Sequence, residues 1–141
     1  MLKSVLRLLL IFALALQSGP LFALGVGVPI LHSAIGEKLL MEVPINGIAT
    51  EDKDKLQISL ATAEIHQSLQ VEPQPIHQKL RFTTVQDDSG RLILLISSTQ
   101  PVNEPFLNFV FHITTPAGEM VREVSVLLDT PHAKASGKLS E

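Results

Sequence analysis

The sequence contains no cysteine, no tryptophan and no tyrosine, and it has only six phenylalanines. Because cysteine is absent, the chain has no disulfide, no thiolate nucleophile and no cysteine-ligated metal site. Because Trp and Tyr are absent, it lacks the aromatic platforms that sugar-binding modules usually expose, which makes peptidoglycan or carbohydrate binding a weak alternative. Basic side chains number 11 against 14 acidic ones and do not cluster, which argues against nucleic acid or an anionic membrane surface as partner.

A long hydrophobic run is missing as well. Lys3 and Arg7 precede an apolar run from Leu8 to Leu16, which is shorter than the roughly 20 residues that a membrane-spanning helix needs. A basic start, a short apolar run and the small residue Ala23 are typical of a secretory signal that is cleaved after Ala23, although an uncleaved anchor remains an alternative. We therefore predict an exported protein with a signal peptide over 1–23, one domain over 24–131 and a disordered tail over 132–141.

An apolar hairpin is predicted between Pro101 and Pro131. The turn at Thr115–Gly118 has Pro at its second position and Gly at its fourth, as a type I turn prefers. Apolar residues recur at every second position before this turn and on one face after it, which is the pattern of strands with one buried face. The residues concerned are Leu107, Phe109, Phe111 and Ile113, then Met120, Val124, Val126 and Leu128.

The same alternation predicts further strands upstream of the hairpin. Pro44 indicates an edge or strand-end position for its strand, and an irregular alternation at Thr83 and Thr84 indicates a bulge. The run Leu92–Ile96 is apolar at every position, as expected for a strand buried on both faces or an inner strand beside a helical cover. The other predicted strands lie at 24–31, 38–45, 56–60 and 78–85, and one short helix at 62–70. This pattern favours an all-β, antiparallel immunoglobulin-like β-sandwich of about seven strands with one short helix.

The residue types that carry catalysis or bind metals are present without a recognisable arrangement. No two of the five histidines have the spacing that places ligands on one helix face; they are His32, His66, His77, His112 and His132. His112, Ser125 and Asp129 can be named as a hydrolytic triad, but Ser125 is not in a nucleophile elbow. Gly25 and Gly27 lack the third glycine and the following helix of a dinucleotide site. We therefore expect no enzymatic activity, no metal and no cofactor.

Several segments resemble the N-terminal periplasmic domain of the FimV/TspA family. They are Leu24-Gly25-Val26-Gly27, Glu104-Pro105-Phe106-Leu107-Asn108-Phe109, Arg122-Glu123 and Leu127-Leu128-Asp129, and the resemblance spans residues 24–131. It implies a role in type IV pilus assembly, twitching motility or organisation of the cell pole, through envelope or pilus-assembly proteins as partners. Thr115 and Val124 stand where the family often has Trp and Tyr. The larger members also carry a peptidoglycan-binding module, a transmembrane helix and a cytoplasmic repeat region, so we expect a short stand-alone version of the first domain.

The polar and exposed members of these segments define a candidate interaction surface. In one interpretation, Phe106 is an apolar anchor in a docking surface for another protein. In the other, the polar residues are structural: Glu104 and Asn108 bond backbone groups at the strand entrance, and Arg122 and Glu123 pair across or along the ladder. The candidate residues are Glu104, Pro105, Phe106, Asn108, Arg122 and Glu123. A chaperone or adaptor that adds a client strand to an open sheet edge is a further alternative.

Overall fold

The computed structural model describes residues 1–15 and 24–130. Helix α1 (Leu2–Ala15) belongs to the predicted signal, and within the described ranges no helix has both the length and the apolar character needed to cross a membrane. The cleavage site predicted after Ala23 and the tail predicted at 132–141 lie outside the described residues.

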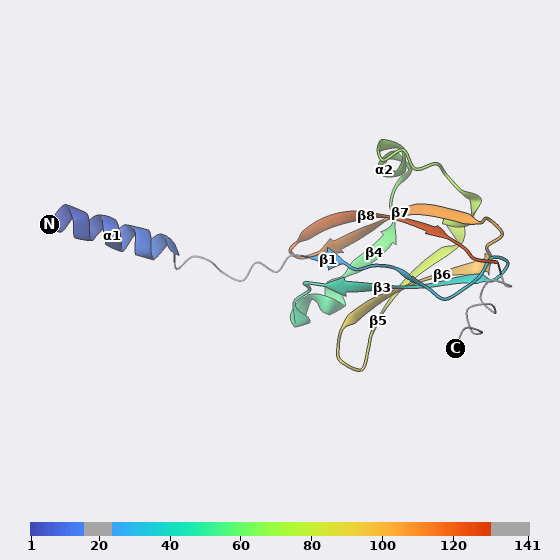
Figure 1. Ribbon diagram of the computed structural model, residues 1–141, viewed down its shortest axis with the longest axis horizontal. Coiled ribbons are helices and arrows are strands. Elements are labelled where there is room, and N and C mark those ends of the chain that lie inside the picture. Colours follow the sequence, from blue (N-terminus) through green and yellow to red (C-terminus); the bar gives the residue numbers. More distant parts are fainter. Residues whose placement is uncertain (16–23, 131–141) are drawn as a thin grey trace, which may run out of the picture.

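The domain is a sandwich of two antiparallel sheets (Figure 1). One sheet has five strands in the order β1-β3-β6-β5, with β2 also paired to β3, and the other has three in the order β4-β7-β8. In chain order the strands are β1 (Gly25–Val26), β2 (Ile30–Leu31), β3 (Lys38–Asn46), β4 (Gln57–Leu60), β5 (Leu80–Gln86), β6 (Leu92–Pro101), β7 (Phe106–Thr115) and β8 (Gly118–Leu127). The predicted antiparallel β-sandwich is confirmed, with one extra strand because the segment 24–31 divides into β1 and β2 on either side of Pro29.

The core lies between the sheets and follows from the alternation of each strand. Val43 and Leu94 are opposite one another in the β3–β6 ladder, and both are fully buried. Phe109 and Phe111 of the other sheet belong to the same core, and the centre of the Phe82 ring lies 6.3 Å and 6.1 Å from the centres of these two rings. The hairpin that the sequence predicts therefore supplies the largest buried side chains of the domain.

Strand β6 is not buried on both faces. Leu92, Leu94 and Ile96 are buried, whereas Ile93 and Leu95 are half-buried on the outer face of the five-stranded sheet. Neighbouring strands shield the outer pair, and no helix of the described residues covers it: Ile93 lies between Pro44 and Val85, and Leu95 lies between Glu42 and Thr83. The continuous apolar run thus comes from one buried face and one half-buried face, which the local sequence does not distinguish from two buried faces.

Two other expectations about the sheet are wrong. β5 pairs with β6 in an unbroken register through Thr83 and Thr84, so the bulge is absent there, and the irregularity lies between Lys38 and Leu40. Strand β3, which contains Pro44, is an interior strand, not an edge. Proline is tolerated because its missing N–H faces the gap between β1 and β2, where its carbonyl accepts a hydrogen bond from the Gly27 N–H.

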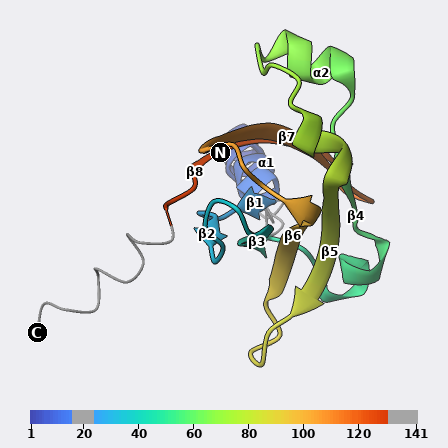
Figure 2. The ribbon, with the colours of Figure 1, turned by 90° about the vertical axis from the view of Figure 1, so that its right-hand side faces the viewer.

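Short helices connect the strands. Helix α2 (Ala63–Ser68) confirms the predicted helix in a shorter form, with the Thr62 side chain accepting from the Ile65 N–H at its N-terminus. It lies on the outer side of β7, where Ala61, Val71 and Val110 form a small second core (Figure 2). Two 3₁₀ helices, η1 (Thr50–Lys55) and η2 (Pro75–Lys79), complete the connections.

Candidate interaction surface

The segment that leads into β7 is fixed by backbone hydrogen bonds. The Val102 N–H donates to the Glu37 carbonyl, the Gly36 N–H donates to the Val102 carbonyl, and the Leu128 N–H donates to the Pro105 carbonyl. The Val102 side chain is fully buried. This bend is therefore a rigid part of the sandwich that holds Glu104 and Pro105 in place.

Three members of the predicted surface gather at this bend. Pro105 is exposed, Glu104 is half-buried, and Phe106 keeps 45% of its surface exposed. Phe106 stands opposite Leu127 in the β7–β8 ladder, and the Leu127 side chain is 71% exposed. Two large apolar side chains are thus adjacent on the outer face of the three-stranded sheet, which supports the interpretation of Phe106 as an apolar anchor.

Asn108 has a structural position. Its side-chain oxygen accepts a hydrogen bond from the Ser125 hydroxyl at 3.0 Å, across the β7–β8 ladder. Its main chain is engaged on the opposite side: the N–H donates to Gln74 Oε1 and the carbonyl accepts from His77 Nε2. Asn108 therefore links β7 to β8 through its side-chain oxygen and to the 61–77 segment through its main chain.

Arg122 and Glu123 lie on opposite faces of β8. Glu123 is opposite Val110 on the outer face, and Arg122 is opposite the core residue Phe111 but is itself exposed because β8 lies at the edge. Within the described part of the chain, no ion pair involves either side chain. The expected pairing of Arg122 and Glu123 across or along the ladder is therefore absent from the described residues, and the two side chains point in opposite directions because they are consecutive in a strand.

The edge of β7 beyond the end of β4 is covered by side chains from the 61–77 segment. His66 Nε2 accepts a hydrogen bond from the Val110 N–H at 3.1 Å. Gln74 accepts from the Asn108 N–H at 3.0 Å and donates to the Phe106 carbonyl at 3.1 Å, while His77 Nε2 donates to the Asn108 carbonyl at 2.7 Å. These three side chains make the hydrogen bonds to the β7 backbone that a longer β4 would otherwise make.

The two histidines of this cover must be neutral to make these bonds. His66 Nδ1 lies 2.9 Å from the Thr62 carbonyl and so carries the proton, which leaves Nε2 free to accept from Val110. In His77 the roles are reversed, because Nε2 donates and Nδ1 accepts from the Gln74 N–H. Burial, opposed by the bond to Asn108 and aided by the His66 ring 5.2 Å away, lowers the pKa of His77.

The histidine cover was missed by the sequence prediction. His66 and Gln74 are 44 and 34 residues from their partners on β7, and nothing in the local pattern distinguishes them from solvated loop residues. Buried histidines are often paired with backbone groups. The only local signal was the position of His66 on a short helix capped by Thr62.

Strand β8 is the free edge of the three-stranded sheet. In an antiparallel ladder, two opposite residues turn their N–H and C=O groups either toward each other or away from each other. The backbone groups of Asn108 and Val110 face the 61–77 segment, so their partners Ser125 and Glu123 turn their own groups away from β7. By the same alternation the N–H and C=O of Val121, Glu123, Ser125 and Leu127 point to the open side.

The residues of the possible triad do not meet. Ser125 is opposite Asn108 and His112 is opposite Val121, four residues away along β8, which is roughly 13 Å at the rise of a strand. His112 Nε2 lies 3.4 Å from Glu119 instead. Among the described residues no three potential metal ligands lie together.

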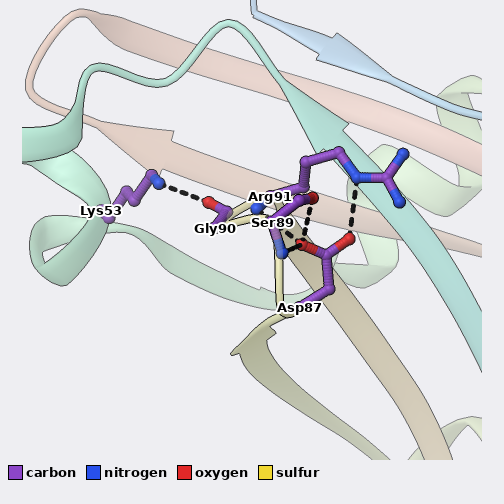
Figure 3. Close-up of polar contacts among 5 residues, drawn as sticks. All are labelled: Lys53, Asp87, Ser89, Gly90 and Arg91. Carbon is purple, nitrogen blue, oxygen red and sulfur yellow. Dashed lines mark hydrogen bonds and ion pairs between the residues drawn. The ribbon is translucent and has the colours of Figure 1, made fainter.

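The loop between β5 and β6 is a self-contained turn at the end of the hairpin (Figure 3). Asp87 Oδ1 accepts from the Ser89 N–H at 3.0 Å, the Ser89 hydroxyl at 2.7 Å and the Arg91 N–H at 2.9 Å, and Oδ2 accepts from Arg91 Nε at 2.7 Å. These bonds hold the pKa of the Asp87 carboxyl far below its usual range. Lys53 Nζ ties η1 to the loop by donating to the Gly90 carbonyl. The carboxylate is thus fully used in shaping the turn.

The fold and the surface define a class of protein: an antiparallel β-sandwich of immunoglobulin type that has an exposed apolar pair beside an open strand. Residues 24–131 match the family described as FimV N-terminal domain Ig-like domain, and the chain belongs to that family. The chain is 33% identical over 119 residues to the motility hub protein FimV of Pseudomonas aeruginosa, in both strain PAO1 and strain UCBPP-PA14. The match covers 84% of this chain and 13% of those proteins. No solved structure gave a significant match.

Proposed function

We propose that this chain is an exported, non-enzymatic protein-interaction domain that acts in the periplasm in the assembly of type IV pili or a related envelope machine. The observation that carries the proposal is that the family match spans the complete sandwich, from β1 to beyond β8, and that the similar proteins are named motility hubs. Because this chain spans only 13% of those proteins, their other parts contribute nothing to the proposal.

The surface chemistry supports binding rather than catalysis. Phe106 and Leu127 present apolar area on a sheet whose other side is the rigid core, and a rigid apolar anchor loses little conformational entropy on binding. Glu123 lies on the same face and supplies a charged rim. We propose that a protein of the motility or secretion machinery docks on this face with Phe106 and Leu127 at its centre.

The test is a pull-down from bacterial envelope extract with the wild-type protein and with Phe106→Ser. We expect the wild type to recover pilus or secretion components and Phe106→Ser to recover several-fold less at an unchanged thermal midpoint. Val85→Ser is the matched control, because Val85 is a similarly exposed strand residue, 39% against 45%, on the other sheet. Recovery that is equal for all three proteins, or recovery of no envelope protein by the wild type, would contradict the proposal. Arg122→Ser is a second control, because Arg122 lies on the opposite face of β8 and its loss should leave recovery unchanged if the partner docks on the outer face.

An adaptor that accepts a client strand is the second candidate function. The observation that favours it is the open edge of β8, because an exposed row of N–H and C=O groups is what strand addition requires. Capture of an extended peptide by the wild type, and its loss when the β8 edge is blocked, is the expected result. Binding of folded partners alone would exclude it.

A further inference from the structure

The domain protects its sheet edges unevenly. Strand β4, at one edge of the three-stranded sheet, packs against β5 of the other sheet, and β1 and β2 are two residues long each. Where β7 extends past β4, the side chains of His66, Gln74 and His77 cover its backbone. Such short strands and covered edges are the devices by which folded proteins prevent edge-to-edge pairing.

Strand β8 has none of these devices apart from three charged side chains, Glu119 and Glu123 on the outer face and Arg122 on the core-side face. It is 10 residues long, contains neither proline nor lysine, and pairs with β7 in a continuous register without a bulge. In the described part of the chain no other strand bonds to its open side. Val121 and Leu127, whose backbone groups point to that side, also keep exposed apolar side chains, 43% and 71% exposed. An unpaired strand of this length and composition is a template for another strand.

We propose that two copies of this chain pair through β8, antiparallel and centred on Val124, so that the three-stranded sheets of both copies become one continuous sheet. This inference concerns the isolated protein and does not depend on the proposed envelope partner. The residue order of β8 favours a second copy as the occupant, because the strand can pair with itself without placing like charges opposite one another. Centring on Val124 pairs residues 121–127 in this way, whereas centring on Ser125 pairs only 123–127 and places Glu123 opposite Leu127.

The register follows from the faces of the sheet. In an antiparallel pair related by a twofold axis, opposite residues lie on the same face, so the pairing must be centred on a residue. Centring on Arg122 or Glu123 places a charge opposite the same charge, which is destabilising. Centring on Val124 places Val121 opposite Leu127 and Glu123 opposite Ser125.

This register also satisfies the backbone. Glu123 and Ser125 both turn their N–H and C=O groups to the open side, so each such pair exchanges two hydrogen bonds across the new interface, as do Val121 and Leu127. On the core-side face, Arg122 lies opposite Val126, where its aliphatic stem covers the half-buried valine and its guanidinium remains in water.

The absence of cysteine makes the register directly testable by oxidation. In the proposed dimer the Cα atoms of Glu123 and Ser125 are about 5.5 Å apart, within the range of a disulfide, whereas Glu123 to Glu123 and Ser125 to Ser125 are diagonal pairs beyond about 7 Å. We expect a mixture of purified full-length Glu123→Cys and Ser125→Cys proteins to form a disulfide-linked dimer roughly tenfold faster than either variant alone. A difference of this size exceeds the error with which cross-linking rates are measured. Equal rates in the mixture and in the single variants would overturn the register.

Blocking the edge tests the pairing itself. Ser125→Pro removes an N–H that points to the open side and no bond to β7, so the fold should persist. We expect it to weaken the dimer by roughly tenfold or more in sedimentation equilibrium, a cost of about 1.4 kcal/mol, whereas Ser125→Ala, which keeps the N–H, retains the dimer. Leu127→Lys is a second edge block that keeps every backbone group, in case the proline variant does not fold. A wild-type protein that is monomeric at high micromolar concentration overturns the proposal. If, in that case, Ser125→Pro also fails to recover a protein that the wild type recovers in the pull-down, the β8 edge binds a strand of that protein instead.

Discussion

His66 offers the sharpest test of the histidine cover on β7. Replacing it by leucine keeps the size of the side chain approximately but leaves the Val110 N–H without an acceptor. Val110 is fully buried and His66 is 5% exposed, so water does not reach the amide in the folded state. The Thr62 carbonyl, the other partner of the ring, also accepts from the His66 backbone N–H, and so it remains satisfied in the variant.

The expected cost of His66→Leu is therefore that of one buried, unsatisfied backbone donor, about 1–3 kcal/mol. At about 4–8 °C per kcal/mol for a domain of roughly this size, the thermal midpoint should fall by roughly 5–20 °C. Thermal unfolding followed by circular dichroism at neutral pH measures this shift. Hydrogen exchange at the Val110 amide provides a local readout, and we expect the amide to lose protection.

Two control variants separate the hydrogen bond from the substitution. In His66→Gln the side-chain oxygen can accept from Val110, as that of Gln74 does from Asn108 two residues earlier on β7, so we expect a smaller loss than for leucine. Gln67→Leu places the same leucine on the exposed side of α2 and should change stability by no more than about 0.5 kcal/mol. The reasoning is refuted if His66→Leu melts within a degree or two of the wild type and Val110 remains protected.

Two further predictions concern ionisable groups. Because the folded pKa of His77 lies below 6.5, its contribution to stability is complete above pH 6.5 and is lost as the pH falls through the folded pKa. The wild type should therefore lose stability between pH 7 and pH 5 more steeply than His77→Gln. Parallel curves of stability against pH for the two proteins would contradict this. The folded pKa of Asp87 lies far below its usual value, so its contribution to stability is complete above the usual pKa and is lost in strong acid, as the pH falls towards the folded pKa. Asp87→Ala should lower the thermal midpoint and increase hydrogen exchange at the Ser89 and Arg91 amides, whereas Asp88→Ala should not.

The parts of the fold that sequence predicted well are those with local signals. The alternation around Phe109 and Phe111 identified the central hairpin, and Thr62 identified the start of α2. The errors occurred where the structure depends on residues that are distant in sequence. Pro44 is tolerated in an interior strand because the pairing is interrupted beside it, between β1 and β2. Ile93 is only half-buried because its outer face is covered by neighbouring strands alone.

The positions of the candidate surface residues follow from sequence only in part, and their role in docking stays a prediction. Phe106 is exposed beside another apolar residue, as an anchor requires, while Asn108 serves the ladder. Arg122 and Glu123 were treated as one feature because they are adjacent in sequence, yet the strand places them on opposite faces. The open edge of β8 could not be predicted, because it depends on which strand ends the sheet.

The side chains that cover β7 have a consequence for the order of folding. The β7–β8 hairpin joins residues that are close in sequence, whereas the bonds of His66, Gln74 and His77 to β7 close loops of 44, 34 and 31 residues. Closing a longer loop costs more entropy, and these bonds have no partner until β7 exists. We therefore expect the 61–77 segment to dock after the hairpin has formed, and local opening of this segment would expose the edge of β7.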